Sequence, residues 1–208
     1  MKFDAEKSQI VESLQNAAAV AERRQTIPIL ANVRLKTLNG KLEVTATDLE
    51  IQIKTYSELI NIEEEGETTV SARKMSELCR SLPDGEKVNF SLTSGKLTVR
   101  ANNFHADFAT ISPDDFPEIE INEELNPLKI NSSILKRVLT KTSFSMASQD
   151  VRYYLNGMLL EVQGSKINGV ATDGHRLALS SSSSVDSNLE VRNILPRKAV
   201  LELSKLLS

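Results

Sequence analysis

Thiol and imidazole groups, the side chains that most often bind zinc or act as nucleophile and base, are few in this sequence. Cys79 is the one cysteine, and the two histidines, His105 and His175, lie far apart in the chain. Neither a zinc-finger spacing nor an HExxH string occurs. The GxxxxGKS/T, GxGxxG and GxSxG motifs are absent as well, so the usual phosphate-cradling loops and the nucleophile elbow are missing.

Three acidic residues, Asp48, Glu50 and Asp173, could in principle hold magnesium for an enzyme that acts on nucleic acid. Asp48 and Asp173, however, occur in matching strings that each follow a predicted strand. That recurrence favours a structural role in a turn. We therefore expect no catalytic residue, no metal and no cofactor, and we keep a magnesium-dependent enzyme as the alternative.

Short strings recur in the same order at a nearly constant offset, which indicates an internal repeat. TIPILAN at 26–32 corresponds to DVRYYLN at 150–156, and ATD at 46–48 recurs at 171–173. ARK at 72–74 corresponds to PRK at 196–198. We interpret the chain as two domains of like construction, 1–125 and 126–208.

Apolar residues recur at helical spacing in four segments, 4–24, 71–82, 131–142 and 196–208. Asn131, Ser132 or Ser133 is available to cap the third helix, and Pro196 suits the first turn of the fourth.

Alternating apolar and polar residues predict strands between these helices. Asn39-Gly40 separates two such runs and is the signal of a two-residue hairpin. Further runs lie at 88–92, 97–99 and 104–108, and the Pro- and acid-rich stretch 112–124 resembles a linker. The fold class is therefore α+β, with two helices packed on antiparallel sheet in each domain. The second copy stops after its second helix, so we expect a fragment whose second domain lacks its last strands.

Charge is distributed unevenly along the chain, which has 25 basic and 28 acidic residues. The four helical segments contain an excess of Lys and Arg, which leaves the strands and loops acidic. If the helices of a domain share one side of the sheet, that side attracts phosphate. Solvated Lys and Arg opposite an apolar stripe explain the helices equally well.

With no apolar run long enough for a membrane span, no secretory signal and a single thiol, we expect a cytoplasmic protein.

Longer strings carry a resemblance to a known family. The strings at 145–160, at 170–178 (VATDGHRLA) and at 195–198 (LPRK) resemble the second domain of the bacterial sliding clamp, the beta subunit of DNA polymerase III. Those at 26–32, 45–50 and 70–74 resemble its first domain. The likeness extends over essentially the whole chain.

This resemblance implies a ring. In the family, three copies of one domain form a chain, two chains close into a homodimer, helices line the hole and strands form the outer wall. The resemblance implies that a third domain is absent here. It also implies a non-catalytic accessory subunit of DNA-directed DNA polymerase, which encircles duplex DNA, confers processivity and docks short peptides of polymerases and the clamp loader.

The resemblance also assigns residues to three surfaces. Those matching the DNA contacts are Arg24, Arg73, Gln149, Tyr153 and Tyr154. Those matching the peptide cleft are Leu155, Thr172, Gly174, His175, Arg176 and Leu177. Those expected on the first-domain side of the ring interface are Lys74, Lys96 and Phe108.

Each surface has a simpler explanation. Tyr153 and Tyr154 could lie at the end of a strand, with one ring in the core. His175 could be a structural residue that makes a hydrogen bond, and Phe108 could be a core residue of a strand. Asn103 and His105 stand where the family often has arginine, which puts the charge pairing of the interface in doubt. A peptide-binding module without a DNA role is a further alternative.

Overall fold

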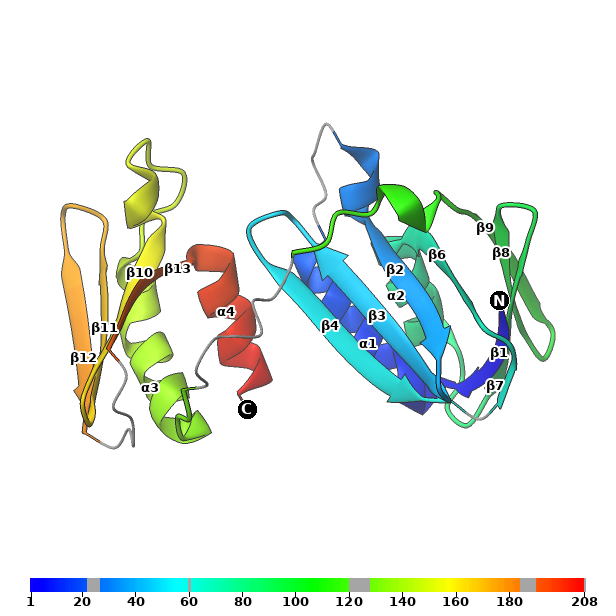
Figure 1. Cartoon of the computed structure of the whole chain (residues 1–208), viewed down its shortest axis with the longest axis horizontal. Helices are drawn as coiled ribbons and strands as arrows, with labels where there is room; N and C mark the ends of the chain where they lie inside the picture. Colours follow the sequence, from blue (N-terminus) through cyan, green and yellow to red (C-terminus); the bar gives the residue numbers. More distant parts are fainter. Residues whose placement is uncertain (22–26, 60, 120–127, 184–189, 208) are drawn as a thin grey trace. The chain divides into compact units, whose positions relative to one another are not determined.

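A computed structural model describes residues 1–21, 27–59, 61–119, 128–183 and 190–207. The chain divides into two compact units, Met1–Glu120 and Ile121–Ser208, and each is described by itself (Figure 1). No helix among the described residues is long and apolar enough to cross a membrane.

Unit 1 contains two antiparallel sheets and two helices. One sheet has the order β5-β1-β7-β8-β9 and the other β4-β3-β2-β6. Its strands are β1 (Lys2–Glu6), β2 (Asn32–Leu38), β3 (Lys41–Thr47), β4 (Gln52–Glu58), β5 (Asn61–Glu64), β6 (Gly66–Ser71), β7 (Lys87–Thr93), β8 (Lys96–Ala101) and β9 (Phe104–Ala109). Its helices are α1 (Lys7–Val20) and α2 (Ala72–Ser81), with short 3-10 turns η1 (Pro28–Ala31) and η2 (Pro113–Asp115).

The core of unit 1 forms where these layers meet. α1 lies against β3, β4 and α2, and α2 also contacts β2 and β6. Ile10 and Leu14 of α1 and Met75 of α2 are completely or almost completely buried. Burial of these apolar faces, rather than local helix propensity, provides most of the stabilisation.

The expected helix at 4–24 begins later than its apolar spacing predicts. Residues 2–6 form β1 instead, which pairs with β5 and β7. The ring of Phe3 stacks on that of Phe90 with centroids 4.6 Å apart. This contact joins residues far apart in the sequence, so a local pattern could not reveal it.

Other local signals are confirmed. Asn39 and Gly40 have φ angles of 52° and 80°, as a hairpin turn with two left-handed residues requires.

The sequence predicts a linker at 112–124, but the described part of this segment packs on unit 1. Phe116 is buried, and Glu118 pairs with Arg34 and Lys54.

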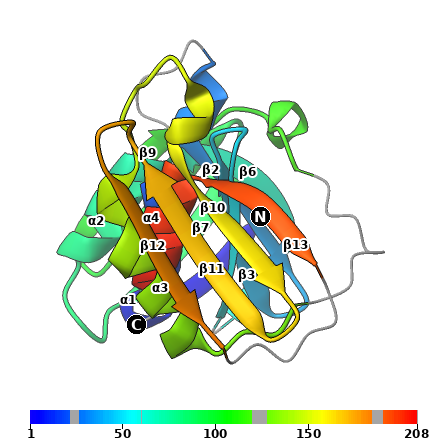
Figure 2. The same ribbon diagram turned by 90° about the vertical axis from the view of Figure 1, so that its left-hand side faces the viewer.

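Unit 2 contains one antiparallel sheet of order β12-β11-β10-β13 (Figure 2). Its elements are α3 (Ser132–Thr142), η3 (Ser143–Ser145), η4 (Tyr153–Leu155), β10 (Gly157–Gln163), β11 (Lys166–Thr172), β12 (Leu177–Ser182), β13 (Val191–Pro196) and α4 (Arg197–Leu206). Asn131 is the cap of α3, and its Oδ1 accepts a hydrogen bond from Ser133 N at 3.0 Å. Pro196 ends β13 and directly precedes α4.

Both helices of unit 2 cover the same face of its sheet. α3 contacts β11 and β12, whereas α4 contacts β10 and β13. Leu139, Met158 and Val200 are fully buried between them. α3 approaches β11 so closely that a Cβ on Gly169 would lie 2.5 Å from Val138 Cγ1. Two helices on antiparallel sheet therefore recur in the two units, which confirms the predicted α+β class.

Candidate functional site

Residues 147–156, which we call the tyrosine loop, are closed at their base by hydrogen bonds. Ala147 N donates to Leu155 O at 2.9 Å. The side chain of Asn156 accepts from Asp150 N at 2.9 Å and donates to Asp150 O at 2.8 Å. Arg197, the first residue of α4, donates from its backbone N to Asn156 O at 2.9 Å. The loop is thereby fixed to the helix that follows β13.

An ion pair orders the outer part of the tyrosine loop. Arg152 donates from Nε and Nη2 to the two carboxylate oxygens of Asp150, at 3.0 and 2.9 Å. Arg152 N donates to Asp150 Oδ1 as well, at 2.8 Å. These hydrogen bonds favour the ionised carboxylate and lower the pKa of Asp150 to about 2.

The aromatic residues of the loop face solvent. Tyr153 is 83% and Tyr154 52% exposed, and the two rings meet edge to face with centroids 6.0 Å apart. The alternative in which one ring enters the core is therefore wrong. Leu155 provides the buried anchor instead. Gln149 is exposed at a φ of 61°, so its backbone is in the left-handed region.

A second feature of unit 2 is the tight turn at 172–176. Asp173 Oδ1 accepts hydrogen bonds from His175 N and Arg176 N, both at 3.0 Å. The Thr172 hydroxyl donates to Arg176 O at 2.7 Å and accepts from Gly174 N at 3.1 Å. The backbone bonds from His175 and Arg176 lower the pKa of Asp173.

Unit 1 repeats this turn at 47–51. Asp48 Oδ1 accepts from Glu50 N at 3.1 Å and from Ile51 N at 2.9 Å. The Thr47 hydroxyl donates to Ile51 O at 2.8 Å. The carboxylates of Asp48 and Asp173, two of the three considered as magnesium ligands, thus accept hydrogen bonds from the backbone of their own turns. Among the described residues, no group of three His, Cys, Asp or Glu side chains could hold a metal ion.

The tyrosine loop and the 172–176 turn lie against each other. A Cβ added at Gly174, whose φ is 89°, would lie 3.2 Å from Arg152 Nη2. Beside them is a pocket of about 450 Å³, lined by Tyr154, Leu155, Gly157, Leu159, Val170, Ala171, Thr172, Arg192 and Ile194.

Two of the six residues predicted for the peptide cleft, Leu155 and Thr172, line this pocket, whereas Gly174, His175, Arg176 and Leu177 do not. The latter four are exposed beside it. The guanidinium of Arg176 lies 5.7 Å from the centre of the Phe144 ring. Only the backbone N of His175 has a hydrogen bond within the described part of the chain, so its ring has no structural partner there.

In unit 1 the predicted DNA and interface residues lie on different elements. Arg73 and Lys74 are exposed in the first turn of α2. Lys96 pairs with Asp107 at 3.1 Å across β8 and β9. Phe108, on the edge strand β9, is half-buried and packs against the core. Arg24 lies outside the described residues.

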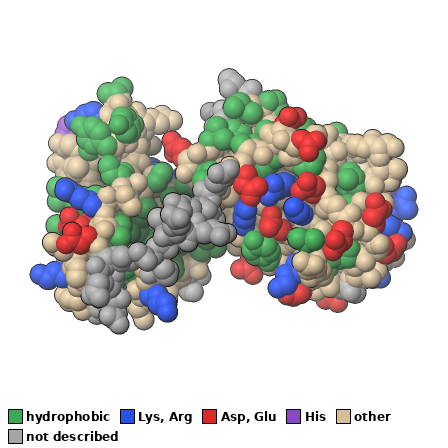
Figure 3. Space-filling view, in the orientation of Figure 1, with side chains coloured by type: hydrophobic (Ala, Val, Ile, Leu, Met, Phe, Trp, Pro, Cys, Tyr) green, Lys and Arg blue, Asp and Glu red, His purple; other side chains and the backbone are tan. Residues whose placement is uncertain are grey.

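Charge separates the helices from the sheet of unit 1. On the face formed by β2, β3 and β4, basic and acidic side chains alternate (Figure 3), and Arg34 lies 3.3 Å from Glu43 and 3.1 Å from Glu118. The helices differ. α1 to α4 carry Lys7, Arg73, Lys74, Arg80, Lys136, Arg137, Lys141, Arg197, Lys198 and Lys205 against Glu12, Glu77 and Glu202. The helices therefore carry an excess of basic residues, although the net charge of the whole chain is −3.

Sequence reasoning missed several residues of these surfaces. Asp150, Arg152 and Asn156 fix the tyrosine loop, and Arg192 and Ile194 of β13 complete the pocket. An Asp two residues before an Arg, with Asn closing the segment, is a turn signal that could have indicated a closed loop. No local sequence pattern indicates that residues of β13 line a pocket together with Tyr154.

Comparison with known proteins agrees with this architecture. Residues 1–120 match the family model for the N-terminal domain of the DNA polymerase III beta subunit, and residues 129–208 match the model for its central domain. The chain belongs to the DNA polymerase III beta subunit family. The two matched domains correspond to the internal repeat predicted from the recurring strings.

Individual members of the family are similar over the whole chain. The beta sliding clamp of Pseudomonas aeruginosa is 42% identical over 209 residues, covering 100% of this chain and 57% of the relative. The beta sliding clamp of Escherichia coli is 39% identical over 207 residues with the same coverage. The chain thus spans little more than half the length of these curated relatives.

Solved structures of family members have the same fold. A P. aeruginosa sliding clamp bound to griselimycin superimposes with a TM-score of 0.92 at 43% identity, and Caulobacter crescentus pol III beta with 0.93 at 32%. Each match covers 100% of this chain and 57% of the solved chain. The predicted clamp fold is confirmed.

Proposed function

We propose that this chain acts in a sliding clamp, which encloses duplex DNA during replication and confers processivity on the replicative polymerase. The single observation that carries the proposal is the match of both units, in order, to two domains of a family whose members are named sliding clamps. The basic excess on the helices is consistent with a surface that faces DNA.

Topology, rather than tight contact, is the proposed source of retention. A closed ring needs few contacts with DNA, so a net charge of −3 is compatible with the function. Basic helices supply a weak, salt-dependent and sequence-independent attraction to the backbone. The proposed role needs no catalysis, metal or cofactor, because the clamp makes and breaks no bond.

The proposed DNA contacts are Arg24, Arg73, Gln149, Tyr153 and Tyr154. Arg73 is exposed and able to reach a phosphate. The exposed rings of Tyr153 and Tyr154 offer flat faces to a base or a sugar. The ordered tyrosine loop supports this role, since exposed aromatic residues on a fixed backbone are typical of binding surfaces.

The proposed peptide site comprises Leu155, Thr172, Gly174, His175, Arg176 and Leu177. The adjacent pocket of about 450 Å³ supports it, because its apolar residues can supply binding energy to a short linear segment. Leu177 is 64% exposed and offers a further apolar contact at its edge. Peptides of polymerases and of the clamp loader are the proposed partners.

The proposed contact between copies in a homodimeric ring uses Lys74, Lys96 and Phe108 of unit 1. Lys96 and Phe108 lie on β8 and its edge neighbour β9, a strand with unpaired backbone groups.

We place the protein in the cytoplasm. Cys79 is buried, and burial raises the pKa of its thiol to about 12, which leaves it unreactive.

The test is topological. Purified protein is loaded onto nicked circular DNA with a clamp loader, and retention after a wash at high salt is measured before and after the circle is cut. The proposal expects retention on the circle, loss on the linear product, and poorer loading or retention for Arg73→Glu. A peptide-binding module would show equal retention on both forms and no effect of Arg73→Glu. Magnesium-dependent cleavage or extension of DNA that Asp173→Ala abolishes would instead establish the enzyme.

A further inference from the structure

The β4-β3-β2-β6 sheet of unit 1 has a pocket of about 270 Å³ on the face opposite α1. The pocket is lined by Lys36, Leu38, Asn39, Lys41, Glu43 and Tyr56. Successive side chains of a strand point to opposite faces of the sheet, and the intervening Leu35, Leu42 and Val44 are buried in the core. None of the lining residues belongs to the proposed DNA, peptide or ring surfaces.

Two large apolar side chains line the pocket from either side of β3. Leu38 of β2 is 48% exposed and Tyr56 of β4 is 60% exposed. In the strand register, Leu38 lies opposite Lys41 and Tyr56 lies opposite Glu43. The volume is smaller than the roughly 300–1,000 Å³ that is typical of small-molecule sites. The pocket therefore fits one side chain of a larger partner better than a whole metabolite.

Lys36 and Lys41 give the pocket its positive charge. The carboxylate of Glu43 also lines the pocket, but it is already bonded. Its Oε1 accepts hydrogen bonds from Arg34 Nη2 at 3.3 Å and from the Thr45 hydroxyl at 3.1 Å. Because Arg34 neutralises Glu43, the two ammonium groups are the charges that a ligand meets. A carboxylate is the group complementary to them.

Both lysines have acidic partners on the sheet, and a ligand can replace these partners. Lys36 Nζ lies 3.7 Å from the Glu67 carboxylate, which is beyond hydrogen-bond distance. Lys41 Nζ lies 3.0 Å from the carboxylate of Glu58, a side chain that is 73% exposed. Exposed ion pairs of this kind contribute little to stability. A carboxylate of a partner protein can therefore exchange with either glutamate at small cost.

The same face of the sheet holds a segment of the chain itself, residues 111–119, which we call the strap. The ring of Phe116 is buried, and its centre lies 5.6 Å from the guanidinium carbon of Arg34. Glu118 pairs with Arg34 at 3.1 Å and also pairs with Lys54. An aromatic residue followed at the second position by a carboxylate is thus a combination that this face binds against its basic side chains.

The pocket lies one row further along the same strands. Aligned residues across β2, β3 and β4 form two rows, Arg34, Thr45 and Lys54, and then Lys36, Glu43 and Tyr56. The strap contacts the first row, whereas Tyr56 in the second row is mostly exposed. Figure 3 shows this face, on which apolar, basic and acidic side chains lie close together. The second row therefore offers cations beside apolar surface to a segment from another protein.

We propose that this pocket docks an acidic peptide segment of a partner protein. One aromatic or branched apolar side chain of the segment lies between Leu38 and Tyr56, and its carboxylates pair with Lys36 and Lys41. The contact is weak, because each of these ion pairs is exposed. The inference goes beyond the proposed function, since this site needs neither DNA nor the pocket of unit 2.

The test is an NMR titration of the whole chain with a synthetic peptide, SPDDFPEI, which has the sequence of residues 112–119. Its acidic residues and its phenylalanine have the chemistry proposed for the partner. The methyl signals of Leu38 and the ring signals of Tyr56 should shift. Tyr56→Ala should weaken binding roughly tenfold, as for an aromatic anchor. The double variant Lys36→Gln/Lys41→Gln should weaken it roughly fivefold.

Matched variants outside the pocket control for lost charge and lost apolar surface. Lys166→Gln removes a charge from the exposed start of β11, and Phe104→Ala removes an exposed ring from β9. Neither substitution should change the affinity. Glu67→Gln frees Lys36 from its acidic partner and should strengthen binding. Circular dichroism verifies that each variant is folded.

The outcomes separate this inference from the clamp proposal. Shifts confined to Leu155 and Thr172 would place the peptide in unit 2, and shifts confined to Phe116 would show exchange with the strap. Either result would overturn the inference and leave the clamp proposal intact. Equal weakening by Lys166→Gln and by the double lysine variant would show unspecific attraction and would overturn it as well. Failure of the retention test on circular DNA would overturn the clamp proposal alone.

Single-stranded nucleic acid is the competing ligand, since a tyrosine ring and lysines also bind bases and phosphates. The inference expects no shift of Leu38 or Tyr56 when an oligothymidylate is added. An oligothymidylate that shifts these signals where the peptide does not would overturn the assignment to an acidic peptide.

Discussion

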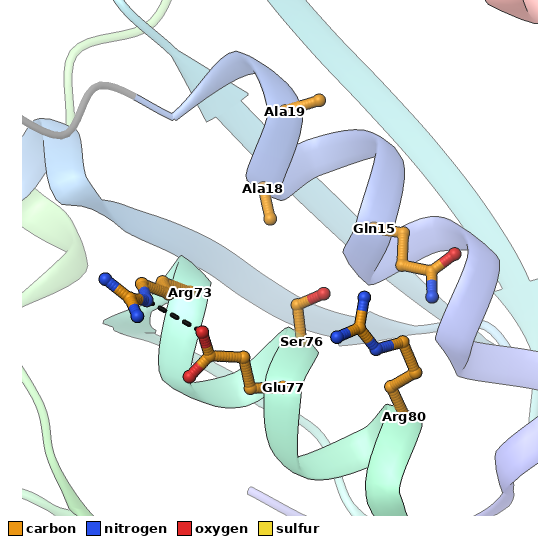
Figure 4. A pocket seen from close by; sticks show the side chains of 7 residues that line it. All are labelled: Gln15, Ala18, Ala19, Arg73, Ser76, Glu77 and Arg80. Atoms are coloured by element: carbon orange, nitrogen blue, oxygen red, sulfur yellow. Dashed lines mark hydrogen bonds and ion pairs between the residues drawn. The ribbon is translucent and has the colours of Figure 1, made fainter.

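Arg73 and Glu77 lie one turn apart on α2, and the Arg73 Nε donates to Glu77 Oε1 at 2.7 Å (Figure 4). This hydrogen bond raises the pKa of Arg73. The carboxylate therefore occupies one of the donors that a backbone phosphate would use and partly neutralises the guanidinium. In the proposed clamp, Glu77 competes with DNA for Arg73 and keeps the contact weak.

Glu77→Gln should strengthen DNA binding. The amide cannot form an ion pair with Arg73, so the guanidinium becomes available to phosphate. We expect a roughly twofold to fivefold higher affinity for duplex at low salt, the range of exposed charge pairs, and a salt slope that is about 0.9 steeper. Anisotropy titrations at several salt concentrations measure both quantities.

The control for this variant is Glu58→Gln. Glu58 pairs with Lys41 at 3.0 Å across β3 and β4, so the substitution removes an equal charge from a like pair on the sheet. Equal gains from the two variants would mean that net charge, rather than release of Arg73, is the cause.

Asp150 should remain ionised in acid that protonates ordinary aspartates. Its pKa is lowered from 3.8 to about 2 by hydrogen bonds from Arg152. A lowered pKa means that the contribution of the carboxylate to folding is complete above 3.8 and is lost as the pH falls through about 2. The carboxyl carbon shift of Asp150 in an NMR titration should therefore still be mostly that of the ionised form at about pH 3.

Arg152→Gln supplies the comparison for this titration. Without the guanidinium, the midpoint of Asp150 should return toward 3.8. A wild-type midpoint near that ordinary value would show that the Asp150–Arg152 pair does not persist in solution.

Gly174→Ala should disturb the tyrosine loop as well as its own turn. Gly174 has a φ of 89°, and the added Cβ would lie 3.2 Å from Arg152 Nη2. Gly164→Ala is the matched control, because its φ is 57° and nothing lies within 4 Å of its Cβ position. Each should destabilise unit 2 by about 1 kcal/mol through left-handed backbone strain.

Only Gly174→Ala should also shift the NMR signals of Arg152 and raise the pKa of Asp150, because only that methyl group displaces the guanidinium. Urea denaturation measures the common loss of stability. Identical spectra around Arg152 in the two variants would refute the contact between loop and turn.

Phe108→Ala should lower the stability of unit 1. Phe108 packs against the core and lies opposite Leu97 in the β8–β9 register. Removing a half-buried ring should cost about 2 kcal/mol. Phe104→Ala, on the same strand but 39% exposed, should cost less. Urea denaturation of the two variants measures this difference in stability. An unchanged midpoint for Phe108→Ala would show that the ring does not stabilise unit 1, which would leave only the proposed contact between copies as its role.

Local signals were sufficient for part of the fold. Asn39-Gly40 demands left-handed backbone, and Met75 and Cys79 mark the buried face of α2, so the hairpin and the helix could be predicted from neighbours in sequence. β1 could not, because the stacking of Phe3 on Phe90 depends on a partner far along the chain.

The same distinction applies to the surfaces. The family strings indicated Tyr153, Tyr154 and Thr172, but no spacing rule indicated that Arg152 lies on Gly174 or that Ile194 reaches the pocket beside Tyr154. Such contacts arise only when strands and loops have packed.

The closure of the tyrosine loop by Asn156 and Arg197 has a consequence for binding thermodynamics. A flexible segment loses about 1–2 kcal/mol of backbone entropy for each residue that a ligand orders. This loop has already lost that freedom during folding, so a ligand meets a preorganised surface. Substitutions that loosen the loop should therefore shorten the lifetime of a complex more than they slow its formation.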